Sequence, residues 1–150
     1  MVSGGAALPN SVLSRWQQIS SHILLERYGM TETGLVLTNP IEPIEARVPG
    51  HVGKPFPGVE VALLDSDGKM HSKSDREGEL LVRSLTNFSG YLDDAEATKE
   101  AYLDGEWFKT GDCALFNSSL DSYKILGRMN EDIISNALGE KISTLEIEEA

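Results

Sequence analysis

The chain has 150 residues, of which 40% are apolar and 25% charged, a composition typical of a folded protein and not of a disordered one. Thirteen basic residues against 24 acidic ones give a net charge of -11, which repels a phosphate backbone and argues against nucleic acid as a partner. The lone cysteine excludes an internal disulfide framework, and no apolar run approaches the roughly 20 residues that a transmembrane segment needs.

The start of the chain predicts a strand, a helix and a second strand. Residues 1–3 look like the end of a strand, after which Asn10 or Ser11 can cap a helix. Apolar residues recur in that helix at helical spacing, at Val12, Trp16, Ile19 and Ile23. A short strand near residues 23–25 then delivers residues 28–32 at its C-terminal end, where ligands bind in open α/β sheets.

The middle of the chain predicts a small, largely antiparallel β subdomain. Residues 39–58 are rich in proline and glycine and are expected to form an extended connection. Residues 59–64 alternate weakly and lead to a tight turn at Asp67 and Gly68. Residues 78–83 would pair with them as the following strand.

Further along, a short helix and two more strands are expected. Asp93 and Glu96 have the spacing of a capping box for a helix that runs through Ala101. Residues 113–116 and 123–126 predict two short strands.

The segment Tyr-Gly-Met-Thr-Glu, residues 28–32, combines an aromatic ring, a hydroxyl and a carboxylate. Tyr28 can stack on a purine, Thr31 can donate to a phosphate oxygen, and Glu32 can bind a Mg²⁺ ion that bridges phosphates. An ordinary strand end followed by a turn is an equally good interpretation of so short a string.

Four further motifs follow this segment in order, and their residues are GELLVR (78–83), GY (90–91), WFKTGD (107–112) and GRMNEDII (127–134). Together the five motifs resemble the adenylate-forming enzymes, the superfamily of acyl-CoA synthetases, luciferases and peptide-synthetase adenylation domains. The resemblance covers the whole chain. It is strongest to the malonyl-CoA synthetase branch, in residues 1–9, 24–32, 47–61 and the closing stretch 132–148.

The resemblance implies a mixed α/β fold in three parts. These are the end of a doubly wound sheet, a small antiparallel β subdomain and the start of a truncated C-terminal domain. Residues 1–126 would be the C-terminal part of the AMP-binding N-terminal domain. Residues 127–150 would be the hinge and the start of the small C-terminal domain.

The resemblance also implies roles for residues in the first third of the chain. Gly5 and Ala6 would lie against the adenine and the acyl substrate, although a plain turn before a helix explains these small residues equally well. Tyr28 would contact the adenine. Thr31 would contact the α-phosphate and Glu32 the Mg²⁺ ion, which makes these two the expected catalytic residues.

The remaining implied roles lie near the end of the chain. Asp112 would accept hydrogen bonds from both ribose hydroxyls, although an aspartate after Thr-Gly is also common in surface turns. Arg128 would meet the ribose or a phosphate, and Asp132 would be the hinge, unless both are surface charges of a solvated turn. Gly139 is the expected glycine of the CoA loop. Ser135 departs from the family, which usually has a lysine there.

The implied reaction joins a small carboxylic acid to CoA at the expense of ATP. The carboxylate attacks the α-phosphate, pyrophosphate leaves, and the CoA thiol captures the acyl adenylate with release of AMP. Malonate or another short acid is the expected substrate, and a ligase for a different acid is an alternative. No residue of this chain identifies the acid, and the expected location is intracellular, either mitochondrial or cytoplasmic.

Two lysine-bearing elements of the family, the phosphate loop and the C-terminal lysine, have no counterpart in the sequence. Ser143 and Glu146 have capping-box spacing, yet the chain ends about two turns later, which is too short for a stable isolated helix. The chain is therefore expected to be a fragment of an acyl-CoA synthetase that is inactive or nearly so alone. The alternative from another class is a truncated, non-catalytic module that binds nucleotide or regulates another protein.

Overall fold

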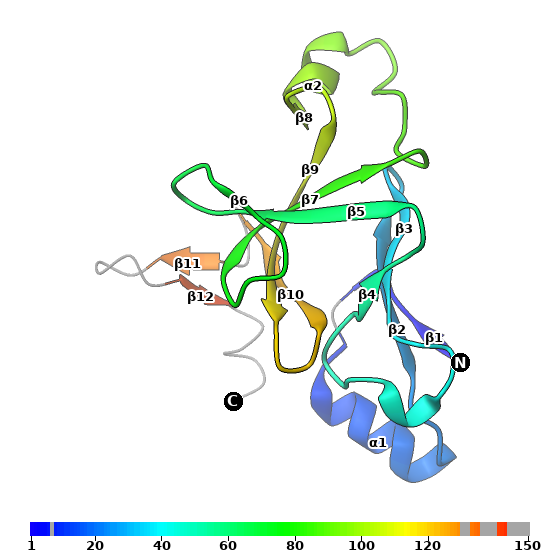
Figure 1. Ribbon diagram of the computed structural model, residues 1–150. Helices are drawn as coiled ribbons and strands as arrows, with labels where there is room; N and C mark the ends of the chain where they lie inside the picture. Colours follow the sequence, from blue (N-terminus) through cyan, green and yellow to red (C-terminus); the bar gives the residue numbers. More distant parts are fainter. Residues whose placement is uncertain (7, 130–132, 136–140, 144–150) are drawn as a thin grey trace.

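The computed structural model describes residues 1–6, 8–129, 133–135 and 141–143. Their strands form a four-stranded sheet, a six-stranded sheet and a separate hairpin (Figure 1). The four-stranded sheet has the order β1-β2-β3-β4, with bounds Val2–Ser3, Leu25–Met30, Gly34–Thr38 and Lys54–Pro55. In this sheet β1 is parallel to β2, whereas β2, β3 and β4 pair antiparallel.

The six-stranded sheet is entirely antiparallel and follows the order β10-β9-β7-β5-β6, with β8 paired to β9 off this path. Its strands are β5 (Val59–Leu64), β6 (Met70–His71), β7 (Glu77–Ser84), β8 (Tyr102–Leu103), β9 (Trp107–Asn117) and β10 (Ser122–Arg128). The hairpin joins β11 (Ile133–Ser135) to β12 (Lys141–Ser143). The mixed α/β class with an antiparallel β subdomain is thus confirmed.

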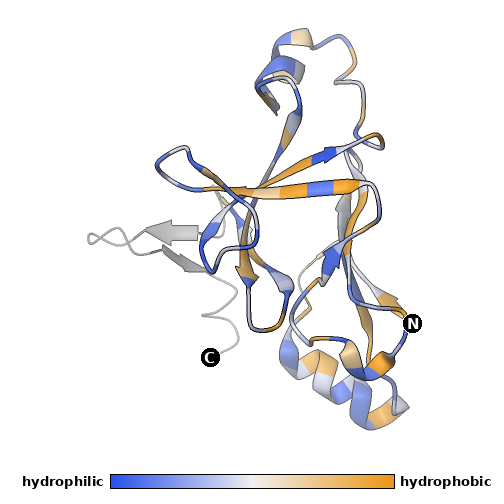
Figure 2. Ribbon diagram, viewed as in Figure 1, coloured by the Kyte–Doolittle hydropathy of each residue, from blue (hydrophilic) through white to orange (hydrophobic). Residues whose placement is uncertain are grey.

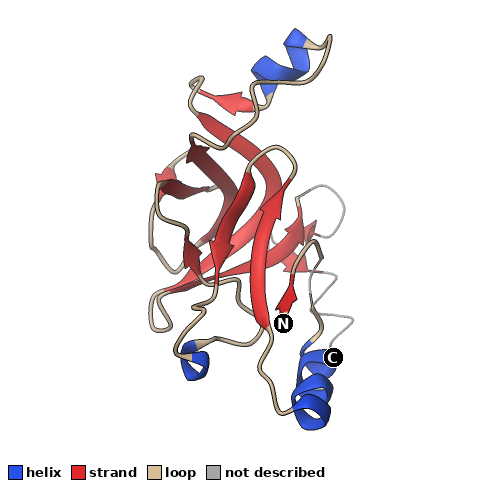
Figure 3. Ribbon diagram, turned by 90° about the vertical axis from the view of Figure 1, so that its right-hand side faces the viewer, coloured by secondary structure: helices blue, strands red, loops and turns tan. Residues whose placement is uncertain are grey.

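Three short helical segments complete the described part: α1 (Asn10–Ser20), a 3-10 helix (Ile44–Ala46) and α2 (Ala95–Glu100). The two α-helices lie at opposite ends of the molecule, with the curved sheets between them (Figure 3). None of the helices in the described ranges is long and apolar enough to cross a bilayer.

One apolar cluster joins the two larger sheets. It is formed by Val36 and Leu37 of β3 and by residues of β5, β7, β9 and β10: Val61, Leu63, Leu80, Val82, Ala114, Phe116 and Tyr123. Figure 2 shows apolar residues concentrated along central strands such as β5, while the loop between β5 and β6 is hydrophilic. Burial of this shared surface stabilises the relative position of the sheets.

The proline- and glycine-rich connection holds the two sheets together at a second place. Val52 N–H donates to Tyr123 O at 2.8 Å, and Tyr123 N–H donates to Gly53 O at 2.8 Å. The buried Asn39 side chain donates to His51 O at 2.6 Å and accepts from Val48 N–H at 3.0 Å. These hydrogen bonds satisfy backbone N–H and C=O groups of residues 48–53, a segment that forms few backbone hydrogen bonds within itself.

Gly53 makes this connection possible, because its φ is +80° and a Cβ there would lie 2.0 Å from Thr38 O. Gly53→Ala is expected to destabilise the chain by about 2 kcal/mol or more beyond the effect of the positive φ. Gly58→Ala is the matched control, since Gly58 has a φ of +81° and nothing within 4 Å of its Cβ position. Urea denaturation of both variants measures the difference, and equal midpoints would contradict the close approach.

Several expected elements differ in detail from those observed. Helix α1 buries Leu13, whereas Val12 and Ile19 are exposed, and Ile23 lies beyond the helix. Trp16 is half-buried as expected, but the rest of the expected apolar stripe is wrong, because the packing face carries Leu13 and Trp16 and leaves Val12 and Ile19 in solvent. The expected cap is also wrong, since Pro9 stands at the N-cap position and makes no side-chain cap bond.

The second helix begins one residue later than expected. Asp94, not Asp93, is its N-cap, and the Asp94 side chain accepts from Ala97 N–H. Asp93 has a left-handed backbone with φ of 57°, a conformation that aspartate tolerates in turns.

The strands agree in place but not always in length. Residues 59–64 form β5, and the turn after them leads through β6 to β7, which pairs with β5 as expected. Strand β9 is longer than residues 113–116 and includes Asp112, which therefore lies in a strand and not in a surface turn. Residues 144–150, which carry the expected last helix, lie outside the described residues.

Candidate functional site

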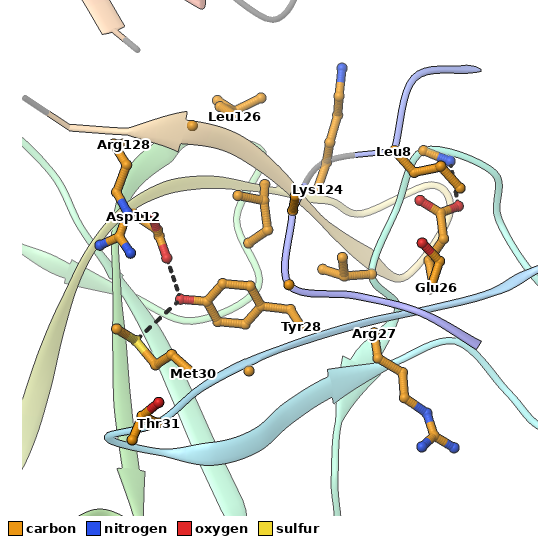
Figure 4. A pocket seen from close by; sticks show the side chains of 18 of the residues that line it. Leu8, Glu26, Arg27, Tyr28, Met30, Thr31, Asp112, Lys124, Leu126 and Arg128 are labelled. Carbon is orange, nitrogen blue, oxygen red and sulfur yellow. Dashed lines mark hydrogen bonds and ion pairs between the residues drawn. The ribbon is translucent and has the colours of Figure 1, made fainter. Parts of the chain in front are cut away.

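A cavity of about 750 Å³ opens between β2, the loop after β1, and strands β9 and β10 (Figure 4). All of the expected site residues that the structure describes line this cavity: Gly5, Ala6, Tyr28, Thr31, Glu32, Asp112 and Arg128. The other two expected residues, Asp132 and Gly139, lie outside the described residues. Segments more than a hundred positions apart in the sequence thus meet around one hollow.

Strand pairing explains the convergence on the N-terminal side. Strand β1 runs parallel to β2, with Ser3 opposite Glu26, so the loop that carries Gly5 emerges beside Tyr28. The approach is tight, since a Cβ at Gly4 would lie 3.0 Å from Arg27 O. A small-residue loop therefore lets the backbone line the cavity closely.

Strand pairing also explains the convergence on the C-terminal side. In the antiparallel ladder of β9 and β10, Arg128 stands directly opposite Asp112. The register shift between Ile125 and Gly127 places a β-bulge just before Arg128. Bulges of this kind redirect side chains, and they are frequent beside binding sites.

A hydrogen-bonded chain of Tyr28, Asp112 and Arg128 crosses the cavity wall. The Tyr28 hydroxyl donates to Asp112 Oδ2 at 2.6 Å, and Arg128 Nε lies 3.1 Å from Asp112 Oδ1. Arg128 Nη1 also donates to Thr110 O at 3.1 Å. The Asp112 side chain is only 11% exposed, whereas Arg128 is 49% exposed. A nearly buried carboxylate is thus held between a phenol and a guanidinium, both of them donors.

The Tyr28 hydroxyl stays protonated in this arrangement. Burial raises the pKa of Tyr28 well above its usual value, and the neighbouring Asp112 carboxylate raises this pKa further. A protonated phenol is the form that donates to a carboxylate. The ring of Tyr28 is consequently held in one orientation, with its body along the cavity (Figure 4).

The turn after β2 carries Thr31 and Glu32 at the edge of the cavity, Thr31 being exposed and Glu32 half-buried. Within the described residues, no three His, Cys, Asp or Glu side chains cluster as a metal cage would require. Mg²⁺ usually keeps several waters and is held by one or two carboxylates together with substrate phosphates. The single carboxylate of Glu32 fits that mode of binding.

Sequence reasoning missed three charged residues of the cavity lining, Glu26, Arg27 and Lys124. Glu26 is buried, and its Oε1 accepts from Gly50 N–H at 2.9 Å. Burial raises the pKa of Glu26, while the bond from Gly50 lowers it. The signal for Glu26 was the period of two in a strand, because Glu26 precedes Tyr28 by two positions. Lys124 had no such signal, because the β-bulge between Ile125 and Gly127 breaks the alternation before Arg128.

The chemistry of the cavity combines a flat ring, a carboxylate with fixed donors, a hydroxyl and local cations. The chain is acidic overall, yet Arg128 and Lys124 line this hollow. Arg27 contributes no cation there, because its guanidinium lies over the ring of Phe56 at 5.8 Å (Figure 4). Such a set can contact a planar base, a vicinal diol and an anionic group at the same time.

Comparison with known proteins agrees with this geometry. The profile of the family described as AMP-binding enzyme matches residues 1–92. Mitochondrial malonate–CoA ligase ACSF3 of Mus musculus is 45% identical over an alignment of 166 residues that covers 99% of this chain and 28% of that protein. The chain therefore spans less than a third of the length of this curated relative.

Solved structures agree as well. The ATP-bound MatB of Rhodopseudomonas palustris has a TM-score of 0.83 and 34% identity, over 95% of this chain and 27% of that one. A malonyl-CoA ligase ternary product complex with methylmalonyl-CoA and AMP has a TM-score of 0.76 and 35% identity, over 99% and 31%. With more than half of its residues matched by the family profile, the chain belongs to the family of AMP-binding enzymes.

Proposed function

We propose that this chain supplies the adenosine- and magnesium-binding part of an ATP-dependent acyl-CoA synthetase. The observation that carries the proposal is the shared cavity, in which Tyr28, Asp112 and Arg128 form one hydrogen-bonded chain beside the turn of Thr31 and Glu32. The match to the AMP-binding family and the ATP-bound relative support a nucleotide as its occupant.

Each residue of the cavity has a role in this proposal. The ring of Tyr28 lies along the adenine, with Gly5 and Ala6 against the base and the acyl group. Asp112 accepts from the ribose hydroxyls, and Arg128 meets the ribose or a phosphate. These contacts fix the nucleotide, so that the acid can approach the α-phosphate in one orientation.

Thr31 and Glu32 act on the phosphates. The Thr31 hydroxyl donates to the α-phosphate, where charge develops as the carboxylate attacks. Glu32 would hold Mg²⁺, which when bound neutralises phosphate charge. An acidic chain needs such local positive charge, because its net charge of -11 repels ATP.

The same proposal covers the second step, in which the CoA thiol captures the acyl adenylate, and the boundary between the two domains. Residues 1–126 would belong to the large domain, and residues 127–150 to the hinge and the start of the small one. Asp132 would absorb the rotation between the two steps, and Gly139 would line the path of CoA.

Malonate is the acid we propose, because the mouse relative is named a malonate–CoA ligase. A short acid of related shape is the alternative, since the ternary complex of another relative contains methylmalonyl-CoA. We also propose an intracellular location, mitochondrial or cytoplasmic, and the mouse relative is named mitochondrial.

The test is AMP release by the protein expressed from the gene's complete reading frame. It is supplied with ATP, Mg²⁺ and CoA, and with malonate, methylmalonate, succinate or a fatty acid in turn. We expect AMP and malonyl-CoA with malonate, and no AMP from residues 1–150 alone. A different preferred acid would reassign the substrate. A folded protein that releases AMP with none of these acids would favour a non-catalytic nucleotide-binding module.

A further inference from the structure

The turn that carries Glu32 is held by a second segment, residues 86–91, which follows β7 of the six-stranded sheet. Phe88 N–H donates to Glu32 O at 2.7 Å, and Thr86 Oγ1 donates to Thr33 O at 2.9 Å. The Tyr91 hydroxyl donates to Glu32 Oε1 at 3.4 Å. The segment therefore contacts both the backbone and the side chain of Glu32.

Tyr91 is itself placed by its neighbours. Its N–H donates to Thr98 Oγ1 at 2.9 Å, and its ring meets the ring of Phe88 edge to face at 4.8 Å. Gly90 has a φ of +149°, and a Cβ there would lie 2.7 Å from Thr98 Cγ2. Only glycine fits this position, which explains why the motif pairs glycine with tyrosine.

Phe88 ties this segment to the six-stranded sheet. The Tyr102 hydroxyl donates to Phe88 O at 2.9 Å, and the Phe88 ring packs edge to face on the buried Phe108 at 5.5 Å. Glu32, by contrast, follows β2 of the four-stranded sheet. The bond from Tyr91 to Glu32 therefore joins a loop anchored on the six-stranded sheet to a turn of the four-stranded sheet.

We propose that Tyr91 is a positioning residue for the metal-binding carboxylate of Glu32. This inference rests on the proposed function, since it requires that Glu32 holds the magnesium of the nucleotide. The hydroxyl donates to one carboxylate oxygen and thereby restricts rotation of the group. Such outer partners orient metal ligands, and their loss typically weakens metal binding 10- to 100-fold.

The test measures metal binding directly and does not depend on turnover. Tyr91→Phe removes the hydroxyl and keeps the ring that packs on Phe88. In the protein from the complete reading frame, electron paramagnetic resonance follows the binding of Mn²⁺ with a non-hydrolysable ATP analogue. Because Tyr91 is 41% exposed, we expect a loss of Mn²⁺ affinity of about 3- to 10-fold, below the usual range for such partners.

Tyr123→Phe is the matched control, because it removes another tyrosine hydroxyl from the six-stranded sheet, in the apolar cluster and away from both residues 86–91 and Glu32. Its Mn²⁺ affinity is expected to equal that of the unmodified protein. Equal loss in both variants, or no loss in Tyr91→Phe, would overturn the positioning role. If the unmodified protein itself fails to bind Mn²⁺ with the analogue, the proposed function fails and this inference with it.

Discussion

Replacing Glu32 by alanine in the protein from the complete reading frame is expected to lower the rate of adenylation by about 100-fold or more. A bound metal ion contributes several kcal/mol to charge stabilisation on the phosphates, and each 1.36 kcal/mol corresponds to about a factor of ten in rate. Glu32 is the one acidic side chain in the turn at residues 31–34, and it lines the cavity. The variant should also need more Mg²⁺ for half-maximal rate, because it lacks the carboxylate that would hold the ion.

A magnesium titration of AMP release measures both effects. Glu45→Ala is the matched control, since Glu45 is exposed in the 3-10 helix and does not line the cavity. Its rate and its Mg²⁺ dependence are expected to be unchanged. Identical titration curves for Glu32→Ala and the unmodified protein would remove Glu32 from the site.

The second large effect is expected for Asp112→Asn, which should weaken nucleotide binding by about 100-fold. Hydrogen bonds to charged groups contribute about 1.5–3 kcal/mol each, and the amide both removes the charge and turns one acceptor into a donor. The new amide nitrogen would also face Tyr28 or Arg128, which are donors themselves. The substitution therefore removes the negative charge of Asp112 and also disrupts its contacts with Tyr28 and Arg128.

Calorimetry with AMP, in the protein from the complete reading frame, measures this change. Asp121→Asn is the control, because Asp121 is an exposed aspartate of the turn between β9 and β10 and lies outside the cavity. It has a φ of 45°, a conformation that asparagine also tolerates. An AMP affinity that Asp112→Asn leaves intact would contradict the ribose contact.

The local motifs could be predicted from the sequence because their chemistry lies in neighbouring residues. Tyr28, Thr31 and Glu32 lie within five positions, so a strand that ends in a turn brings them to one edge without long-range help. The resemblance to a family then added Asp112 and Arg128. Taken alone, Asp112 looked more like a surface-turn residue than a ligand of ribose, and its place in β9 opposite Arg128 excludes the surface turn.

Other features depended on contacts that no local pattern contains. Leu13 is buried instead of Val12 because the position of α1 against the sheets selects its inner face. Asp94 caps α2 because Asp93 adopts the left-handed turn before it. Glu26 lines the cavity because the register of β1 and β2 places it opposite Ser3. Strand periodicity predicts which residues share a face, but it does not tell whether that face lines a cavity or packs in a core.

The amino-acid sequence by itself determined the family of this protein, its antiparallel β subdomain and the residue types around its cavity, because these follow from short motifs and from alternation along strands. Only the tertiary structure decided which side chains touch, as between Tyr28 and Asp112 or Tyr91 and Glu32. The physical reason is that such pairs are 84 and 59 positions apart. Their contact depends on strand register and sheet packing, and these are properties of the whole core.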